Sequence, residues 1–285
     1  ATPTMAATGA TYYIRKETAA NCVDIVPIVV NTVNCACPAP PSVVITQPNV
    51  DVCGTMVATF DYTVANGPAS VSHDGTGTLS ISSLANGTST FTYTPAAADA
   101  GNTVTITANI ADTDGTGPCE AVSDMATVTV NPNPTMTGGM VCVGDMITLT
   151  GSGTPNGTSP YVSDNMSVAI VTDGGAVTGV SAGTATITYT DINNCTVMAT
   201  VTVNAVPDLS VTSPITNSCP ATTVDLTDVS VTGLADGNST VGTISYHTVS
   251  NPANSTDQVV ATPTMAATGA TYYIRKETAA NCVDI

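Results

Sequence analysis

The stretch ATPTMAATGATYYIRKETAANCVDI (Ala1–Ile25) returns letter for letter as Ala261–Ile285, displaced by 260 residues. A match of this length does not arise by chance, so it decides the architecture before any local pattern does. Within each copy the run TYYIRKET alternates as a β-strand does. The sequence therefore predicts one 260-residue period of a tandem array, followed by a short overlap.

Composition favours strands over helices. Thr, Val, Ser, Asn and Gly are abundant, whereas good helix formers such as Lys, Arg and Glu are scarce. The chain has no Trp and only two Phe, so its cores must come mainly from Val, Ile, Leu, Met and Ala. Such side chains bury less area each than aromatic ones. We predict an all-β fold whose thin cores need a further constraint.

Charge excludes one class of partner. Acidic residues number 21 against four basic ones, and the net charge is -17. This charge repels nucleic acid and anionic membrane surfaces, so no nucleic-acid partner is expected. A solvated surface explains the acidity, and recruitment of divalent cations is the alternative. No run of about 18 apolar residues occurs, so we predict no membrane span in this segment. Any signal peptide or anchor would lie outside it.

Three proline-containing joints divide the chain: CACPAPP (Cys35–Pro41), NPNP (Asn131–Pro134) and AVP (Ala205–Pro207). Between the joints, short β-branched or alternating runs recur about every ten residues, which is typical of antiparallel sandwiches. The predicted segments are residues 1–34, the C-terminal part of a domain whose front half is absent; residues 35–131 and 132–204, two complete domains; and residues 205–285, a domain that lacks its last strand.

The run VPIVVN (Val26–Asn31) would supply that last strand, but it follows only the first copy of the repeat. We therefore expect residues 1–34 to pack against strands that residues 35–285 do not supply. A preceding period or a neighbouring copy of the chain would provide them.

An early and a late cysteine recur in each predicted domain. Early cysteines lie near the first strand and late ones precede the last strand, so we predict one disulfide per domain: Cys53 with Cys119, Cys142 with Cys195, and Cys219 with Cys282. Each bridge would close more than fifty residues and contribute about 4 kcal/mol in the chain-entropy model. Such bridges require an oxidising compartment, so we expect an extracellular or cell-surface location.

Three cysteines are left over. Cys22 is the copy of Cys282, so its partner is expected in a preceding period. Cys35 and Cys37 form a C-x-C pair, for which a strained internal bridge, a bridge to a neighbouring chain and a weak metal clip all stay open.

Other candidate sites are weaker. ADTDGTGPCE begins like a calcium loop with Asp112, Asp114 and Glu120, but the full ligand spacing fails, so an ordinary hairpin turn is the alternative. Calcium is the only cofactor that the sequence suggests. The two histidines, His73 and His247, fall in different predicted domains without a nucleophile context. We therefore do not expect an enzyme.

The run SDNMSVAIVTDGGAVTGVSAGTATITYT (Ser163–Thr190) resembles the group 2 bacterial immunoglobulin-like repeat, with its S-x-N-x-x-V-A-x-V strand followed by G-x-V-T-G-V-x-x-G-x-A-x-I-T. Val168, Ile170, Val177 and Val180 are the apolar strand positions of this motif. FTYTPAAADAGNTVTITANIAD (Phe91–Asp112) resembles cadherin-like sandwich repeats. The resemblance implies immunoglobulin-like domains at residues 35–131 and 132–204. The cysteines and the strand rhythm assign the same fold to residues 205–285, and hence to residues 1–34 as part of such a domain.

Arrays of such repeats are similar to those of giant cell-surface adhesins and extracellular fibres, and they bring no catalytic residues. The resemblance implies a secreted structural or adhesive segment whose partners are other copies of itself. Edge strands with few lysines could pair between chains, so we expect a homomeric bundle, with a single string as the alternative. A glycan-binding or protein-binding adhesin domain and accessory repeats of a secreted enzyme are the other functional interpretations.

Overall fold

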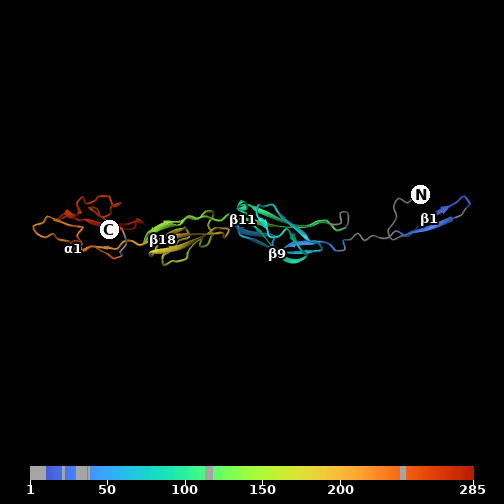
Figure 1. The fold of residues 1–285 in the computed structure, drawn as a ribbon, viewed down its shortest axis with the longest axis horizontal. Coiled ribbons are helices and arrows are strands. Elements are labelled where there is room, and N and C mark those ends of the chain that lie inside the picture. Colours follow the sequence, from blue (N-terminus) through green and yellow to red (C-terminus); the bar gives the residue numbers. More distant parts are fainter. Residues whose placement is uncertain (1–10, 21–22, 30–36, 38, 113–117, 238–241) are drawn as a thin grey trace. The chain divides into compact units, whose positions relative to one another are not determined.

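The computed structural model describes residues 11–20, 23–29, 37, 39–112, 118–237 and 242–285. Regular structure in these ranges is nearly all β-strand, as predicted, and the α-helix α1 (Val229–Thr232) is a single turn. The chain divides into two compact units, Ala1–Val130 and Asn131–Ile285, which are coloured along the sequence in Figure 1. No α-helix in the described part of the chain has the length and apolar run that a membrane span requires.

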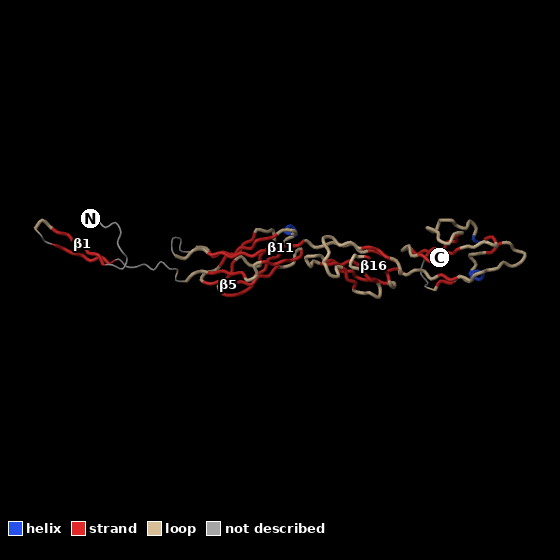
Figure 2. The backbone as a smooth tube through the Cα atoms, turned by 180° about the vertical axis from the view of Figure 1, so that it is seen from behind, coloured by secondary structure: helices blue, strands red, loops and turns tan. Residues whose placement is uncertain are grey.

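The first unit holds a β-sandwich between Ser42 and Asn131 (Figures 1 and 2). One sheet has the order β3-β5-β9-β7 and the other β4-β11-β10-β6-β8. These orders correspond to the A-B-E-D and G-F-C sheets of the immunoglobulin fold. The strands are β3 (Ser42–Ile45), β4 (Asn49–Cys53), β5 (Ala58–Ala65), β6 (Ala69–His73), β7 (Thr78–Leu79), β8 (Ser83–Leu84), β9 (Gly87–Thr94), β10 (Thr103–Ile110) and β11 (Val122–Asn131), with a 3-10 turn at Ala97–Asp99.

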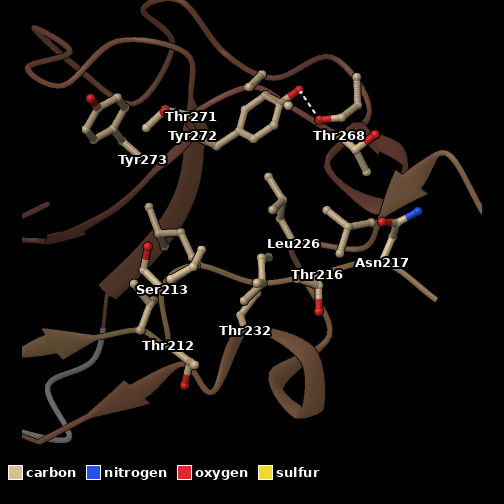
Figure 3. A pocket seen from close by; sticks show the side chains of 18 of the residues that line it. Thr212, Ser213, Thr216, Asn217, Leu226, Thr232, Thr268, Thr271, Tyr272 and Tyr273 are labelled. Carbon is tan, nitrogen blue, oxygen red and sulfur yellow. Dashed lines mark hydrogen bonds between the residues drawn. The ribbon is translucent and has the colours of Figure 1, made fainter.

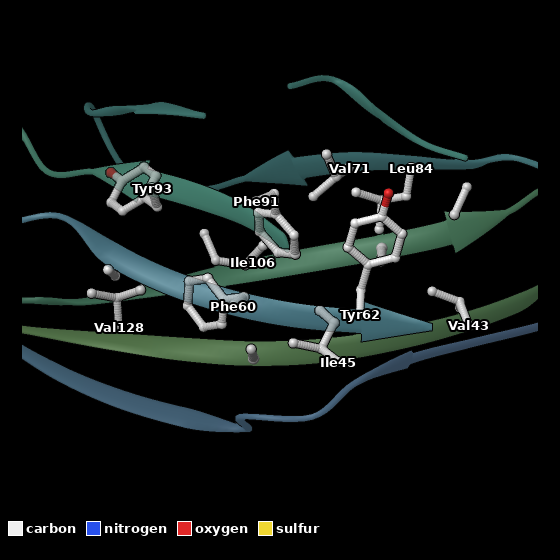
Figure 4. Packing of buried hydrophobic residues seen from close by; sticks show 14 of the residues in the cluster. Val43, Ile45, Phe60, Tyr62, Val71, Leu84, Phe91, Tyr93, Ile106 and Val128 are labelled. Atoms are coloured by element: carbon white, nitrogen blue, oxygen red, sulfur yellow. The ribbon is translucent and has the colours of Figure 1, made fainter. Parts of the chain in front are cut away.

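Aromatic rings occupy the centre of the first core. Phe60 and Phe91 stack with ring centroids 5.1 Å apart, and Tyr62 lies 6.2 Å from Phe91 (Figure 4). Burial alternates along β5 and β10, as a strand with one face on a core requires. Both phenylalanines of the sequence thus lie where they bury most area.

The second sandwich lies between Gly139 and Asn204. One sheet has the order β12-β18-β17-β14 and the other β13-β16-β15, and β12 runs parallel to β18. The strands are β12 (Gly139–Cys142), β13 (Met146–Thr148), β14 (Tyr161–Ser163), β15 (Ala169–Val171), β16 (Ala176–Gly179), β17 (Gly183–Thr190) and β18 (Thr196–Asn204). Of the motif positions, Val168 and Val177 are buried in this core, whereas Ile170 and Val180 are exposed.

The third sandwich is built from short strands. The sheet β22-β24-β25 accompanies the pairs β19-β21 and β20-β23. The elements are β19 (Leu209–Ser210), β20 (Thr223–Val224), β21 (Ala235–Asp236), β22 (Gly242–His247), a 3-10 turn at Pro263–Met265, β23 (Ala266–Ala267), β24 (Tyr273–Thr278) and β25 (Val283–Asp284).

A β-branched run of this domain contains a helical turn. The run TTVDLTDVSVTG (residues 222–233) has the composition of a strand, but its last part forms α1. The Asp228 side chain accepts a hydrogen bond from the Ser230 N–H, and Gly233 ends the turn at a φ of 61°. Caps at both ends therefore outweigh the β-branched pattern of the residues between them.

The N-terminal copy of the repeat forms a hairpin of β1 (Thr11–Glu17) and β2 (Val23–Val29). Its register runs from Thr11 opposite Val29 to Glu17 opposite Val23. Among the described residues, these strands pair only with each other.

Candidate functional site

The repeated sequence occupies two different environments. In the N-terminal copy both faces of the hairpin meet solvent, with Ile14 56% and Val29 63% exposed. A two-stranded hairpin is at best marginally stable alone in water, and clustered exposed apolar side chains mark interaction surfaces. The hairpin Thr11–Val29 is therefore the candidate functional surface, which we call the N-terminal hairpin.

The C-terminal copy of the same sequence is buried. β24 lies between β22 and β25, and Arg275 and Lys276 are only 3% and 5% exposed. Lys276 lies opposite Asp284 and Glu277 opposite Val283, which repeats the register of Lys16 with Asp24 and Glu17 with Val23. Both copies thus form the same hairpin, and only the C-terminal copy has β22 beside it.

The other sandwiches show which strand would lie beside β1 of the N-terminal hairpin. In the first, β10 lies between β6 and β11, and in the second, β17 lies between β14 and β18. These are the C, F and G strands of the immunoglobulin fold. β22, β24 and β25 repeat this order in the third sandwich. The N-terminal hairpin is consequently an F–G pair, and no strand in the described part of the chain takes the C position beside it.

The turn between F and G is set by local sequence. Asn194 and Asn281 both adopt positive φ, 62° and 61°, one residue before the late cysteine. The Cys195 N–H donates to the Asp191 carboxylate at 2.9 Å, and the Cys282 N–H donates to Thr278 Oγ1 at 3.1 Å. Such three-residue loops with a left-handed residue are a common hairpin connection. They place each late cysteine at the entry to its G strand.

The disulfides differ from the predicted pairs. Cys37 is bonded to Cys119, and Cys142 is bonded to Cys282. The predicted pairings of Cys53 with Cys119, of Cys142 with Cys195 and of Cys219 with Cys282 are therefore wrong. Cys53 and Cys195 are disulfide-bonded, and Cys219 is an exposed free thiol. Cys37 is thus bonded within the chain, whereas Cys22 and Cys35 lie outside the described residues.

Strand direction explains the error. Because β12 is parallel to β18, Cys142 lies opposite Asn204 at the far end of the strand that Cys195 precedes. At about 3.3 Å per residue, the two ends of β18 are about 26 Å apart, whereas bonded cysteines need Cα atoms within about 7 Å. The Cα atoms of Cys142 and Cys282 are 5.6 Å apart. Cys142 therefore reaches the late cysteine of the following sandwich, not Cys195 of its own.

A groove of about 560 Å³ runs along the third sandwich beside the end of its short G strand (Figure 3). The segment from Leu209 to Asn217 lines one side, and Thr271 to Ile274 line the other. The Leu209 N–H donates to Asp284 Oδ2 at 2.5 Å, so this segment flanks the G strand. Ile285, which follows the G strand, also lines the groove.

The arginine of the repeat is paired within its own strand in both copies. Arg275 Nη1 lies 2.5 Å from Glu277 Oε2, and this hydrogen bond lowers the pKa of the Glu277 carboxyl. In the exposed copy, Arg15 Nη2 lies 2.7 Å from Glu17 Oε2. The ion pair between arginine and glutamate is therefore present in the exposed copy as well. Such a pair reduces the free-energy cost of transferring the guanidinium out of water.

Each histidine makes its contacts within its own sandwich. His247 is fully buried, with Nε2 2.7 Å from Ser245 Oγ and Nδ1 2.6 Å from the Asp257 carbonyl oxygen. These contacts hold β22 to the loop that follows it. His73 packs against Tyr93, with ring centroids 5.0 Å apart.

The predicted calcium residues are only partly described. Asp112 and Glu120 flank residues 113–117, and Asp114 lies outside the described ranges. Within those ranges, no group of three or more His, Cys, Asp or Glu side chains is arranged to hold a metal ion.

No protein-family model and no curated protein matches this chain. Similar solved structures include a 282-residue fragment of intimin bound to the intimin-binding domain of the translocated intimin receptor (21% identity, 59% of this chain, 66% of that chain, TM-score 0.41). Another is the insect immune protein hemolin (16% identity, 68% of this chain, 56% of that chain, TM-score 0.32). A third is a structure of fibronectin(III)-like modules of CbhA from Clostridium thermocellum (16% identity, 57% of this chain, 95% of that chain, TM-score 0.26). At these identities and TM-scores the likenesses carry no functional argument, and the immunoglobulin-like assignment rests on strand order.

Proposed function

We propose that this chain is a non-enzymatic, load-bearing repeat segment of a secreted bacterial surface fibre or adhesin, in which copies follow one another. The observation that carries the proposal is the disulfide from Cys142 to Cys282, because it joins the second sandwich covalently to the end of the third. A bridge placed in this way is not needed to close either core. It does alter how tension passes along the chain.

The disulfides provide a short covalent path for force. The bond from Cys37 to Cys119 bypasses a sequence separation of 82, and the bond from Cys142 to Cys282 bypasses one of 140. Along these two bonds, tension between Cys37 and Cys282 passes through the backbone from Cys119 to Cys142. That stretch contains β11, the joint NPNP and β12. Most strands of the three sandwiches are therefore shielded from load.

The location follows from the same bonds. Disulfides form and persist in oxidising compartments such as the cell surface. Their presence, together with the acidic surface of a chain with net charge -17, supports a soluble fibre outside the cell.

Force spectroscopy on single molecules of the whole chain tests this function. With both termini held and the disulfides intact, unfolding should not extend the two segments that the disulfides close, Cys37 to Cys119 and Cys142 to Cys282, whose sequence separations are 82 and 140. At about 3.4 Å per residue, reduction should release further extensions of about 280 Å and about 480 Å. Cys219→Ser is the matched control and should behave as the parent, since Cys219 is a free thiol. Equal final extensions with and without reductant would overturn the load-bearing role.

A further inference from the structure

We propose that the N-terminal hairpin of one copy of this chain completes the third sandwich of a second copy, with β1 against β22 and β2 in the groove. The inference rests on the proposed fibre function, for which it names the partner and the contact. The second copy can be the preceding repeat of one long chain or a separate molecule.

The chain itself shows which strand covers this sequence. β22 pairs with β24 from Gly242 opposite Thr278 to His247 opposite Tyr273. Shifted by the 260-residue repeat, the same register places Gly242 opposite Thr18 and His247 opposite Tyr13. Because the two strands are identical in sequence, every backbone hydrogen bond and side-chain contact of the C-terminal copy is available to the N-terminal one.

In the N-terminal hairpin the pairing extends beyond the residues that the two copies share. β25 pairs with β24 only at Val283 and Asp284, whereas β2 continues its pairing to Val29. In the N-terminal hairpin, Thr11, Tyr12 and Tyr13 lie opposite Val29, Ile28 and Pro27. Their counterparts Thr271, Tyr272 and Tyr273 line the groove in Figure 3. Residues Val26–Val29 would therefore enter the groove in the existing register.

The chemistry of the groove suits this occupant. Its lining includes Val211, Ile215 and Leu226, and Pro27 at the centre of β2 lacks the N–H that burial would leave unpaired. Residues 205–260 contain five Asp and no Lys or Arg, and the hairpin adds no net negative charge, because Arg15 and Lys16 balance its two acidic residues. A contact between one end of a copy and the other end of the next does not close on itself, so it generates filaments.

A fused protein tests the pairing without disturbing the chain. A second copy of residues 205–260 is placed ahead of Ala1, and amide exchange is followed in peptides that contain Val26–Val29, a sequence that occurs once. We expect exchange there to slow by about tenfold or more relative to the parent chain. Ile14→Asp should remove the protection, whereas Ala19→Asp should retain it, because its counterpart Ala279 is exposed. Equal exchange with and without the added residues would overturn the proposal.

A second experiment distinguishes separate molecules from consecutive repeats. In the whole chain, Cys282→Ser with Ile274→Asp releases the resident C-terminal hairpin, so the intact N-terminal hairpin of another molecule can replace it. Light scattering should show oligomers, and peptide mapping should find Cys142 bonded to Cys22 of another molecule. Adding Ile14→Asp should restore monomers. Oligomers that persist with Ile14→Asp would contradict hairpin insertion, and monomers throughout, with protection in the fused protein, assign the pairing to consecutive repeats.

The two proposals can fail separately. Extension under force reports the disulfide path, whereas exchange in β2 reports the hairpin contact. A chain that extends fully without reductant but protects Val26–Val29 in the fused protein would keep the pairing and lose the load-bearing role.

Discussion

At the scale of single residues, Asp99 is a buried carboxylate whose side chain makes several hydrogen bonds; the residue is 3% exposed. Its carboxylate accepts hydrogen bonds from the Thr76 N–H at 2.8 Å, the Tyr93 hydroxyl at 2.7 Å and the Ala96 N–H at 2.9 Å. Burial acts to raise the pKa of Asp99, but these donors outweigh it and hold the pKa well below its usual range. Burial and the bond to Asp99 together raise the pKa of Tyr93 to about 12.

Asp99→Asn should destabilise the first sandwich by about 1.5 to 3 kcal/mol at neutral pH, since it removes hydrogen bonds to a charged acceptor. The folded-state pKa is depressed, so this stabilisation is complete above about pH 4 and is lost as the pH falls through the folded-state pKa. Denaturant unfolding at pH 7 and near pH 2 would measure the difference. The exposed Asp51→Asn should change stability by less than about 0.5 kcal/mol at either pH.

At the scale of elements, long alternating runs could be predicted from the sequence, and they form β5, β10, β17 and β18. Short strands such as β6, β12 and β14 were missed because three to five residues carry too little pattern. Their existence depends on the neighbours that they pair with. Two F–G turns could be predicted from local sequence, since the asparagines before Cys195 and Cys282 tolerate a left-handed backbone.

Asn194→Val should therefore cost the second sandwich about 1 to 2 kcal/mol or more, because a β-branched residue is strained at a φ of 62°. Asn194→Gly should be close to neutral. Urea unfolding would report both values. Val in place of the adjacent Asn193, which does not have positive φ, is the control and should cost less than about 0.5 kcal/mol. Equal losses at Asn193 and Asn194 would exclude the backbone explanation.

At the scale of the whole molecule, the cysteines were recognised as disulfide-forming but were paired wrongly. The recurrence of the cysteines in the sequence does not by itself show at which end of a domain each cysteine lies. That position also depends on the direction of the strand beside it. The parallel pairing of β12 with β18 places Cys142 beyond the reach of Cys195. Cys219, the remaining early cysteine, is left exposed.

Thiol labelling and peptide mapping check this arrangement. Without reductant, iodoacetamide should modify Cys219 but not Cys37, Cys119, Cys142 or Cys282. Digestion of the unreduced chain should yield linked peptides of Cys37 with Cys119 and of Cys142 with Cys282. A linked peptide of Cys142 with Cys195 would contradict the arrangement and restore one bridge per sandwich.

The sequence by itself determined the strand rhythm, the repeat and the F–G hairpin, whose register is the same in both copies because turn and cross-strand contacts are local. The tertiary structure alone decided the disulfide partners and the burial of the repeated stretch. Arg15 and Arg275 have identical neighbours in sequence, yet one is exposed and the other 3% exposed. The difference is the strand β22, which pairs with the C-terminal copy, whereas no strand among the described residues takes that place beside the N-terminal copy.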